Sequence, residues 1–565
     1  MTRPQMLFRI VALTLMMTAL SAAGQAPPAA PLVRGEMSVP AGAAKVEQTS
    51  VGNRNRAALA ASFDGLGEGF EGPQGKATLR NPSDNSIAVG PDHIVVTVNS
   101  RMAIFTKKGA KFDSTGKVLY GPVNTNNVFK GFGGQCEASN NGDAVVRYDQ
   151  LADRWLIVMP LFRRGPERPD QPAEWKASDH AYLSPPGVAG QPGNDFPLYQ
   201  PPAPDPGNAG EEVQRPRERP PQLKGPYSMC YAISTGPDPL GSYYRYEFLR
   251  PLFPDYPRPA IWPDGYYVPT STGDTVIQKQ ACVVDRARML KGKPATEQCF
   301  VVDGVNFLNN ADVDGKQTPP RGAPNVMMAA GGTQLKGALE DDSVYSWKFH
   351  VDWKRPKRST LSGPTRIAVA SYHYLCGGQL TNCVSQPSSD RRLDAQGDKI
   401  MSRLVYRRLG NQESIVAVHS VDTSAGGGGV RWYEFRVNKN RSVSLYQQGT
   451  YAPDQFFRWM ASPAIDRFGN IGIGYSFGGS PNFAGQRFAG RLAGDPPGTL
   501  TLGETVLVEG EAAQNAMRWE DYTQTAVDPS DDCTIWYVGD YLRKDAKNYS
   551  TRIGAFQMPG CGGDR

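Results

Sequence analysis

Residues 518–536 read RWEDYTQTAVDPSDDCTIW, in which two apolar runs flank a turn rich in Asp and Pro. We expect two antiparallel strands here, at roughly 522–527 and 534–538, because β-branched and aromatic residues favour strands while Asp and Pro favour tight turns. A single hairpin is not stable in water. The rest of the chain must therefore supply strands that cover this one.

Turns of the same kind recur upstream. An Asp, Gly or Pro turn separates two apolar runs at 89–94, 148–155, 261–266 and 465–471. The repeating unit would begin near Asp84, Asp143, Arg258, Asn325, Asp398, Trp459 and Glu520. Without one long insert, the spacings are roughly 55 to 75 residues, a little above the usual period of propeller repeats. We predict an all-β chain forming a single β-propeller of four-stranded antiparallel blades, seven of them, with six or eight as alternatives.

Several of these runs also carry a resemblance. Residues 63–67, 81–99, 143–155, 262–267, 446–454 and 519–536 are similar to stretches of a group of largely uncharacterised, secreted bacterial β-propeller proteins, sialidase-like in shape, with Asp-box-like turns. The resemblance implies a propeller over roughly 63–561 and a structural role for the turn aspartates. It implies no activity, because propellers host hydrolases, lyases, oxidases and binding platforms.

The N-terminus has the layout of a secretory signal peptide. Arg3 and Arg9 precede an apolar run at 10–20 and small residues at 21–24. We predict a signal peptide at 1–23, a flexible segment at 24–76 and the propeller at 77–565, in an exported protein that is periplasmic or extracellular. The Pro-rich insert at 163–225 is expected to be a surface loop, since its composition does not suit a strand ladder. No segment of the mature chain is expected to span a membrane.

The eight cysteines favour disulfides, because their number is even in a chain that we expect to be exported. Nearest-neighbour pairing joins Cys136 with Cys230, Cys282 with Cys299, Cys376 with Cys383, and Cys533 with Cys561. The alternative, a zinc site, would need Cys-x-x-Cys spacing, which the sequence lacks. The net charge of +6 is spread along the chain, so nucleic acid is not an expected partner, and we expect a monomer.

In a propeller, residues at the starts of the inner strands converge on one mouth of the central channel. We expect Asp84, Asp143, Asp398 and Asp521 there, together with Arg403, Arg458 and Tyr522. One interpretation is glycoside cleavage, which needs a carboxylic acid and a carboxylate. The expected catalytic residues are Asp521, Asp398, Glu434 and Tyr522, and the expected substrate-binding residues are Arg458, Arg431, Arg403, Trp459 and Trp519.

Two other interpretations of these aspartates stay open. Asp84 and Asp143 would suit a Ca²⁺ ion, the one cofactor that the sequence suggests, since Ca²⁺ takes oxygen ligands. Alternatively, each Asp satisfies backbone N–H groups and holds the strands in register. The sequence contains no zinc-protease, phosphate-loop or serine-hydrolase motif.

The function that we favour is glycan binding or glycan cleavage at the channel mouth, and an enzyme of this kind would be a hydrolase of glycosidic bonds. The alternative is a non-catalytic scaffold for protein interactions in the envelope or outside the cell. The sequence does not decide whether there is turnover.

Overall fold

The computed structural model describes residues 39–166, 181–187, 225–271, 278–378 and 381–562. Its contacts divide the chain into two units, Met1–Ser38 and Val39–Arg565, and all the described residues belong to the second. The predicted signal peptide therefore lies outside the described residues. None of the described helices has the length and the apolar character that crossing a bilayer demands.

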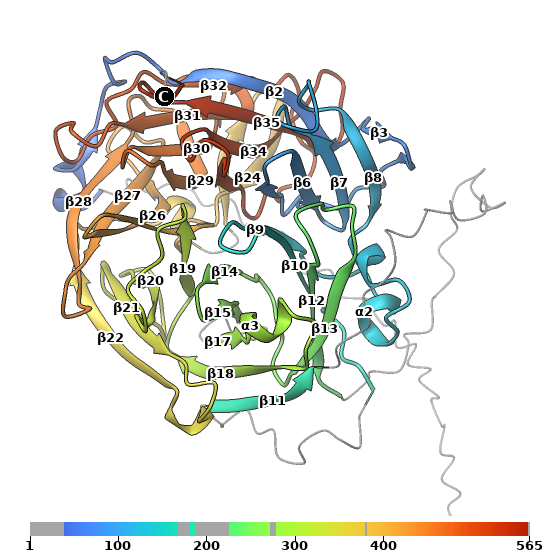
Figure 1. The fold of residues 1–565 in the computed structure, drawn as a ribbon. Helices are drawn as coiled ribbons and strands as arrows, with labels where there is room; N and C mark the ends of the chain where they lie inside the picture. Colours follow the sequence, from blue (N-terminus) through green and yellow to red (C-terminus); the bar gives the residue numbers. More distant parts are fainter. Residues whose placement is uncertain (1–38, 167–180, 188–224, 272–277, 379–380, 563–565) are drawn as a thin grey trace, which may run out of the picture. The chain divides into compact units, whose positions relative to one another are not determined.

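The described chain is all-β and is built from successive antiparallel groups of strands, as predicted (Figure 1). The first two groups are β5 (Ser86–Val89), β6 (His93–Val98), β7 (Arg101–Thr106) and β8 (Val118–Asn124), followed by β9 (Val145–Asp149), β10 (Arg154–Pro160), β12 (Tyr227–Ser234) and β13 (Tyr243–Arg250). The third is β14 (Ala260–Trp262), β15 (Gly265–Tyr267), β17 (Gln278–Val284), β18 (Ala295–Asp303) and β11 (Ala181–Gly187), with β16 (Thr270–Ser271) beside β17.

Four further groups follow in chain order. The fourth is β19 (Asn309–Asp314), β20 (Asn325–Ala330), β21 (Ser343–His350) and β22 (Thr360–Ala368), and the fifth is β25 (Leu404–Leu409), β26 (Gln412–Asp422), β27 (Gly428–Val437) and β28 (Val443–Tyr451). The sixth is β29 (Phe457–Ile465), β30 (Ile471–Gly479), β31 (Asn482–Arg491) and β32 (Thr505–Val508). The last is β33 (Gln524–Val527), β34 (Ile535–Tyr541), β35 (Ser550–Gln557) and β2 (Ala58–Gly67).

Short elements lie between or beside these groups. The strands are β1 (Glu47–Gln48), which runs parallel to β28, and the pairs β3 (Glu71–Gly72) with β4 (Gly75–Lys76) and β23 (Asn382–Gln386) with β24 (Ser389–Asp394). The helical turns are α1 (Ala41–Ala44), η1 (Thr125–Phe129), α2 (Gly134–Ala138), α3 (Arg286–Met289), η2 (Pro356–Arg358) and η3 (Leu375–Gly377).

The apolar cores lie between neighbouring groups, because the strands bury both faces. In β10, Trp155 and Ile157 pack against the first group, whereas Leu156 and Val158 pack against the third. In β6, Val95 faces the second group, and its neighbours in the strand pack against the last group. Runs such as β6 and β30 are buried at every position, which is the burial pattern of strands covered on both sides.

The first strands of the groups are neighbours in chain order. β5 lies beside β9, β9 beside β14, and β14 beside β19, which is followed by β25, β29 and β33. β33 in turn contacts β5, so the succession closes on itself. β19 pairs in parallel with β25, and β27 with β29, so the fourth, fifth and sixth groups form one continuous sheet. Loops that precede the first strands are therefore brought to one place although they are far apart in the sequence.

Two segments that we expected to lack regular structure contribute strands. β2 falls in the predicted flexible segment, yet it pairs antiparallel with β35 and completes the last group. β11 falls in the Pro-rich insert and pairs with β18, and the rest of the insert, 167–180 and 188–224, lies outside the described residues. In both cases an exposed sheet edge gives the strand its partner, which composition alone does not reveal.

All four disulfides join the cysteines that nearest-neighbour pairing predicted. They link Cys136 to Cys230, Cys282 to Cys299, Cys376 to Cys383 and Cys533 to Cys561. No cysteine is left free. Such bonds persist in oxidising compartments, which is consistent with an exported protein.

The hairpin of residues 522–538 is fixed to the first group by a buried ion pair. The Lys107 ammonium donates to both carboxylate oxygens of Asp528, at 2.9 and 3.0 Å, and the Trp536 indole donates to the same carboxylate at 3.0 Å. The side chains of Lys107 and Asp528 are 5% and 7% exposed. This turn aspartate therefore joins the last group of strands to the first.

We predict that Asp528→Ala will lower the free energy of unfolding by about 3–5 kcal/mol, because it leaves the Lys107 ammonium buried without its counter-charge. Urea unfolding of the purified protein measures the change. The double substitution Lys107→Met with Asp528→Leu removes both charges, and most of the stability should return. Equal losses in the single and double variants would contradict this account.

Candidate functional site

Four carboxyl groups meet where the loops before the first strands converge. Asp84, Asp143, Asp255 and Asp521, here called the carboxyl cluster, precede β5, β9, β14 and β33. The four groups lie close enough to interact, since the charge of Asp521 raises the pKa of each of the other three. The sequence predicted three of the four for the mouth, and Asp255 was missed.

Asp84 and Asp143 are buried neighbours, and a side-chain hydrogen-bonding contact between them affects the pKa of each. Asp84 is 1% exposed and Asp143 is 5% exposed. Burial raises the pKa of Asp84 well above its ordinary value, and the charges of Asp143 and Asp521 and the bond to Asp143 raise it further. Burial also raises the pKa of Asp143, assisted by Asp255 and Asp521, while the bond from Asp84 opposes that rise. Both carboxyls therefore favour the protonated form more strongly than an exposed Asp does.

Asp521 is anchored by Arg518. The guanidinium donates to Asp521 Oδ2 at 2.5 Å and to Asp394 Oδ2 at 2.9 Å. Burial raises the pKa of Asp394 to about 7, with a further rise from the charge of Asp521 and an opposing effect of Arg518. The Arg518 side chain is 40% exposed, so this edge of the cluster is open to solvent.

The backbone at the cluster adopts left-handed conformations that residues other than glycine seldom take. Asp84, Tyr256 and Asp521 have φ values of 47°, 57° and 75°. Asp visits this region more readily than other side chains, whereas a Tyr there is uncommon. Strain of this kind persists where the surrounding structure imposes it, and it is concentrated at functional sites.

Two tyrosines and an arginine form one wall of the cluster. The ring of Tyr256 meets that of Tyr522 edge to face at 5.3 Å, and the Tyr256 hydroxyl donates to the carbonyl of Asp521 at 2.8 Å. The Arg258 guanidinium lies over both rings, 3.6 and 4.7 Å from their centroids. The Tyr522 hydroxyl and Arg258 Nη2 are buried and have no hydrogen-bond partner, which is costly in a folded protein.

Asp398, a predicted catalytic residue, is engaged at the edge of the same region. Its carboxylate lies 3.1 Å from the Lys399 ammonium and accepts a hydrogen bond from Asn306 at 2.6 Å. Lys399 and Lys279 both lie over the ring of Phe307, at 4.2 and 4.7 Å. Burial, together with the charge of Lys399, lowers the pKa of Lys279 to about 7.

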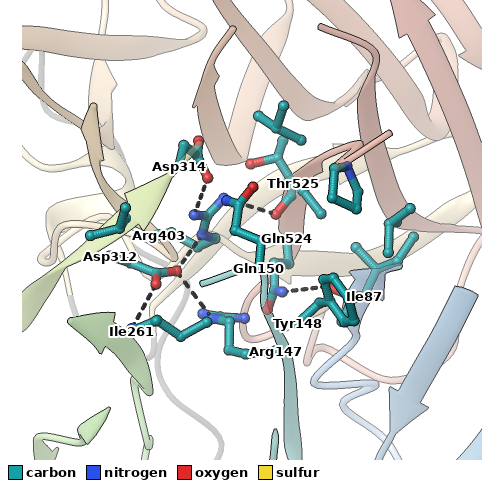
Figure 2. A pocket seen from close by; sticks show the side chains of 16 residues that line it. Ile87, Arg147, Tyr148, Gln150, Ile261, Asp312, Asp314, Arg403, Gln524 and Thr525 are labelled. Carbon is teal, nitrogen blue, oxygen red and sulfur yellow. Dashed lines mark hydrogen bonds and ion pairs between the residues drawn. The ribbon is translucent and has the colours of Figure 1, made fainter. Parts of the chain in front are cut away.

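A small polar cavity lies farther along the first strands (Figure 2). Arg403 donates to Asp312 at 2.7 Å and to Asp314, and Arg147 lies 3.3 Å from Asp312. The cavity encloses about 30 Å³, which is room for about one water molecule. Arg403 thus lines this cavity, which is too small for a sugar ring.

The structure does not bring the other predicted residues to the cluster. Glu434 in β27 accepts hydrogen bonds from Arg436 and Gln447, and Arg431 donates to Thr450 and to the carbonyl of Ala370. Both residues lie on the third strand of their group, whereas the cluster forms before the first strands.

Arg458, Trp459 and Trp519 are also engaged elsewhere. Arg458 is paired with Asp454 and Glu504. Trp459 and Trp519 are fully buried, and the indole of Trp519 donates to Ser476. None of these three side chains is exposed for a ligand to contact.

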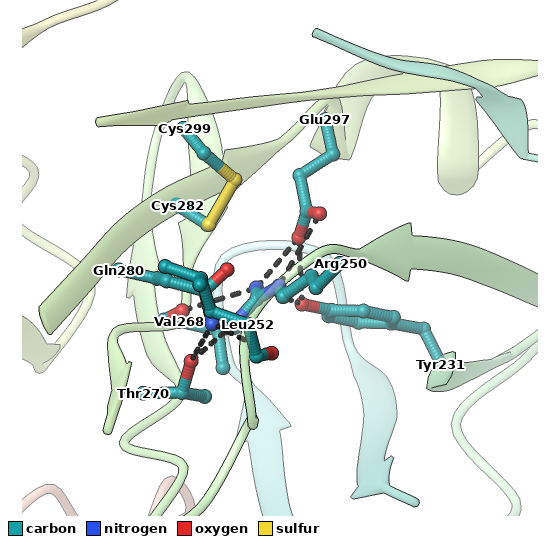
Figure 3. Close-up of a disulfide and its surroundings, with 9 residues drawn as sticks. All are labelled: Tyr231, Arg250, Leu252, Val268, Thr270, Gln280, Cys282, Glu297 and Cys299. Atoms are coloured by element: carbon teal, nitrogen blue, oxygen red, sulfur yellow. Dashed lines mark hydrogen bonds and ion pairs between the residues drawn. A yellow bond between two sulfur atoms is a disulfide. The ribbon is translucent and has the colours of Figure 1, made fainter. Parts of the chain in front are cut away.

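One group of potential metal ligands lies close together, away from the carboxyl cluster. Among the described residues, the one group of three His, Cys, Asp or Glu ligand atoms within 4.8 Å of one another is Cys282, Glu297 and Cys299. Here the sulfurs form a disulfide, and Glu297 pairs with Arg250 at 2.6 Å (Figure 3). A thiolate is needed for metal ligation, so the oxidised pair is not a metal site. Ca²⁺ at Asp84 and Asp143 stays a prediction.

Comparisons with known proteins give no family for this chain. No family model and no curated protein matches it. Solved structures that align with it include a protein of unknown function from Dyadobacter fermentans, at 10% identity over 89% of this chain and 99% of that chain, with a TM-score of 0.33. A polysaccharide lyase, an ulvan lyase, aligns at 10% identity over 90% and 95%, with a TM-score of 0.36. The WD40 domain of SCAP from fission yeast aligns at 6% identity over 85% and 96%, with a TM-score of 0.31. None is similar enough to identify an activity.

The raised pKa values predict how stability depends on pH. A carboxyl whose pKa is higher in the folded state contributes stability that is complete below its unfolded pKa, near 4, and is lost as the pH rises through the folded pKa. For Asp394 that loss extends to about pH 7. Asp143→Asn removes one of the buried charges. The Tm of the variant should therefore increase relative to that of the natural protein as the pH rises from 4 to 8. Thermal unfolding across this range measures the gain.

Asp113→Asn provides the control, because Asp113 is exposed. The Tm of this variant should match that of the natural protein at every pH. A constant difference in Tm between Asp143→Asn and the natural protein from pH 4 to 8 would refute the assignment of Asp143 to a buried, like-charged cluster.

The unpartnered hydroxyl of Tyr522 gives a second prediction. Tyr522→Phe should leave Tm unchanged or raise it slightly, since it removes a buried polar atom that bonds to nothing in the protein. By contrast, Tyr256→Phe should lower Tm, because it removes the bond to Asp521. Differential scanning fluorimetry compares the two variants. A larger loss for Tyr522→Phe than for Tyr256→Phe would show that the hydroxyl has a structural partner.

Proposed function

We propose that this protein is an exported, seven-bladed β-propeller that binds glycans at the carboxyl cluster and cleaves a glycosidic bond there. Seven blades are supported by the seven first strands, β5, β9, β14, β19, β25, β29 and β33, and by the contact of β33 with β5. The disulfides support export, because they need an oxidising compartment.

The observation that carries the proposed activity is the burial of Asp84 beside two further carboxyls, Asp143 and Asp521. Glycoside cleavage requires one carboxyl that is still protonated at the working pH and a second that is ionised. The raised pKa of Asp84, which results from burial and from the neighbouring charges, supplies the first requirement. Asp521, which accepts a hydrogen bond from Arg518, supplies the carboxylate.

The roles follow from these positions. Asp84 donates its proton to the glycosidic oxygen as the bond between that oxygen and the anomeric carbon breaks. Asp521 then acts on the anomeric carbon, directly or through a water molecule. The charge of Asp143 raises the pKa of Asp84 and so helps to keep the proton there. Asp398, which Lys399 and Asn306 engage, is left with a supporting role.

The alternative is a scaffold without catalysis, in which the aspartates only satisfy groups of the protein. This is the role of turn residues such as Asp466, which accepts hydrogen bonds from the backbone of Phe468 and Asn470. Asp84 and Asp521 differ from it, because each has one buried carboxylate oxygen with no hydrogen-bond partner. That difference favours a ligand-binding cluster over a structural one.

The test is turnover of a polysaccharide panel, measured as new reducing ends. Asp84→Asn and Asp521→Asn should each lower the rate about 10²–10⁴-fold, the usual contribution of general acid–base groups. Asp113→Asn, the exposed control, should retain full activity. Circular dichroism and Tm confirm that each variant is folded.

Two results would refute the proposal. One is turnover that survives in folded Asp84→Asn and Asp521→Asn. The other is a natural protein that cleaves nothing on the panel, which would favour the scaffold.

A further inference from the structure

We infer that the glycan recognised at the carboxyl cluster is an amino sugar, and that its free ammonium group binds among Asp84, Asp143, Asp255 and Asp521. This inference rests on the proposed function and names its substrate class. It follows from the balance of charge at the cluster, from the buried oxygen atoms that lack partners, and from the chemical kind of those atoms.

The first argument is that carboxyl groups outnumber the cations. The cations that act on the cluster and its surroundings are Arg258, Arg518, Lys279 and Lys399, and the carboxyls are Asp84, Asp143, Asp255, Asp394, Asp398 and Asp521. Lys399 pairs with Asp398, and Arg518 is shared by Asp394 and Asp521. In the described part of the chain, Asp84, Asp143 and Asp255 form no ion pair. A cationic ligand would supply the missing counter-charge, whereas an anionic sugar would add to the repulsion.

The second argument concerns buried atoms without partners. Asp84 Oδ1, Asp521 Oδ1 and the Tyr522 hydroxyl form no hydrogen bond within the protein. Asp84, Asp521 and Tyr522 are 1%, 8% and 1% exposed. The Tyr522 hydroxyl is not part of the acidic group, yet Asp143 and Asp84 are the charges that act on it most strongly. Three acceptor atoms match the three N–H donors of a primary ammonium group.

The third argument separates an ammonium group from a metal ion. Oxygens that share one Ca²⁺ at about 2.4 Å lie within roughly 4.8 Å of each other. In the described residues, no three carboxylates of the cluster meet that limit. An ammonium group directs its three N–H donors tetrahedrally, so acceptors about 2.9 Å from the nitrogen lie roughly 4.7 Å apart. One of the three unpartnered acceptors is the neutral Tyr522 hydroxyl, which accepts a hydrogen bond from an ammonium group but is not among the usual ligands of Ca²⁺.

The ligand reaches the cluster from its open edge. Arg518 is 40% exposed and Asp255 is half-buried, while Asp84 and Asp143 lie deeper. Asp255 is the most exposed of the four carboxyls. Binding of a positive charge lowers the pKa of the nearby carboxyls, so protons should be released as the ligand binds.

The experiment compares three hexasaccharides with the same β-1,4-linked glucose backbone. They carry an ammonium group, an acetamido group or a hydroxyl group at C2: the hexamers of glucosamine, of N-acetylglucosamine and of glucose. Isothermal titration calorimetry at pH 6, in two buffers of different ionisation enthalpy, measures affinity and proton release. We expect the glucosamine hexamer to bind at least 10-fold more tightly than the other two, with release of protons, and to weaken in high salt.

Variants locate the binding. Asp255→Asn should reduce the preference for the glucosamine hexamer, and Tyr522→Phe should weaken its binding without loss of Tm. The exposed control Asp113→Asn should leave both unchanged. A parallel titration with CaCl₂ tests whether the cluster binds a metal ion instead. Ca²⁺ that binds more tightly than the glucosamine hexamer and displaces it would overturn the inference.

Equal or weaker binding of the glucosamine hexamer, or binding of none of the three, would also overturn it. Binding of the glucosamine hexamer without cleavage would leave this inference standing and refute the hydrolysis. Asp84-dependent cleavage of an uncharged glycan, with no preference for the glucosamine hexamer, would support the hydrolysis and overturn this inference.

Discussion

The fold depends on strands that bury both of their faces. β10 sends alternate side chains into two different cores, and β6 does the same. A group of strands with two apolar faces needs a neighbour on each side, and each neighbour has the same requirement. Successive groups satisfy it by following one another until the last meets the first through β33 and β5. The meeting of distant loops is a by-product of this apolar packing.

That packing explains what the sequence could and could not predict about the fold. Hairpins such as 522–538 were predictable, because their turns and apolar runs are local signals. Six of the seven predicted repeat starts lie at or near β5, β9, β14, β25, β29 and β33, but Asn325 marks the second strand of its group. The true first strand, β19, reads NNADVD, and its Asn and Asp residues resemble a turn. Such residues are buried there because they bond to the segment before the neighbouring strand β25, as Asp312 and Asp314 do with Arg403.

The candidate site, too, could be predicted only in part from the sequence. Asp84, Asp143 and Asp521 could be predicted because they stand directly before recognisable strands. Asp255 was missed because it lies among prolines, in PDYPRP, which read as an irregular loop. Glu434 and Arg431 were placed at the mouth from residue type alone, although their strand is third in its group. Which side chain meets which across the ring is a tertiary property that local patterns do not encode.

The pairing of β2 with β35 has a consequence for synthesis. The Thr551 hydroxyl donates to the carbonyl of Leu66, 485 residues away along the chain, so the last group cannot form until nearly all of the polypeptide has been made. Until then β2 has no partner, and β34 has an open edge of the kind that recruits other unpaired strands. The unfinished polypeptide is thus the form most vulnerable to aggregation and proteolysis.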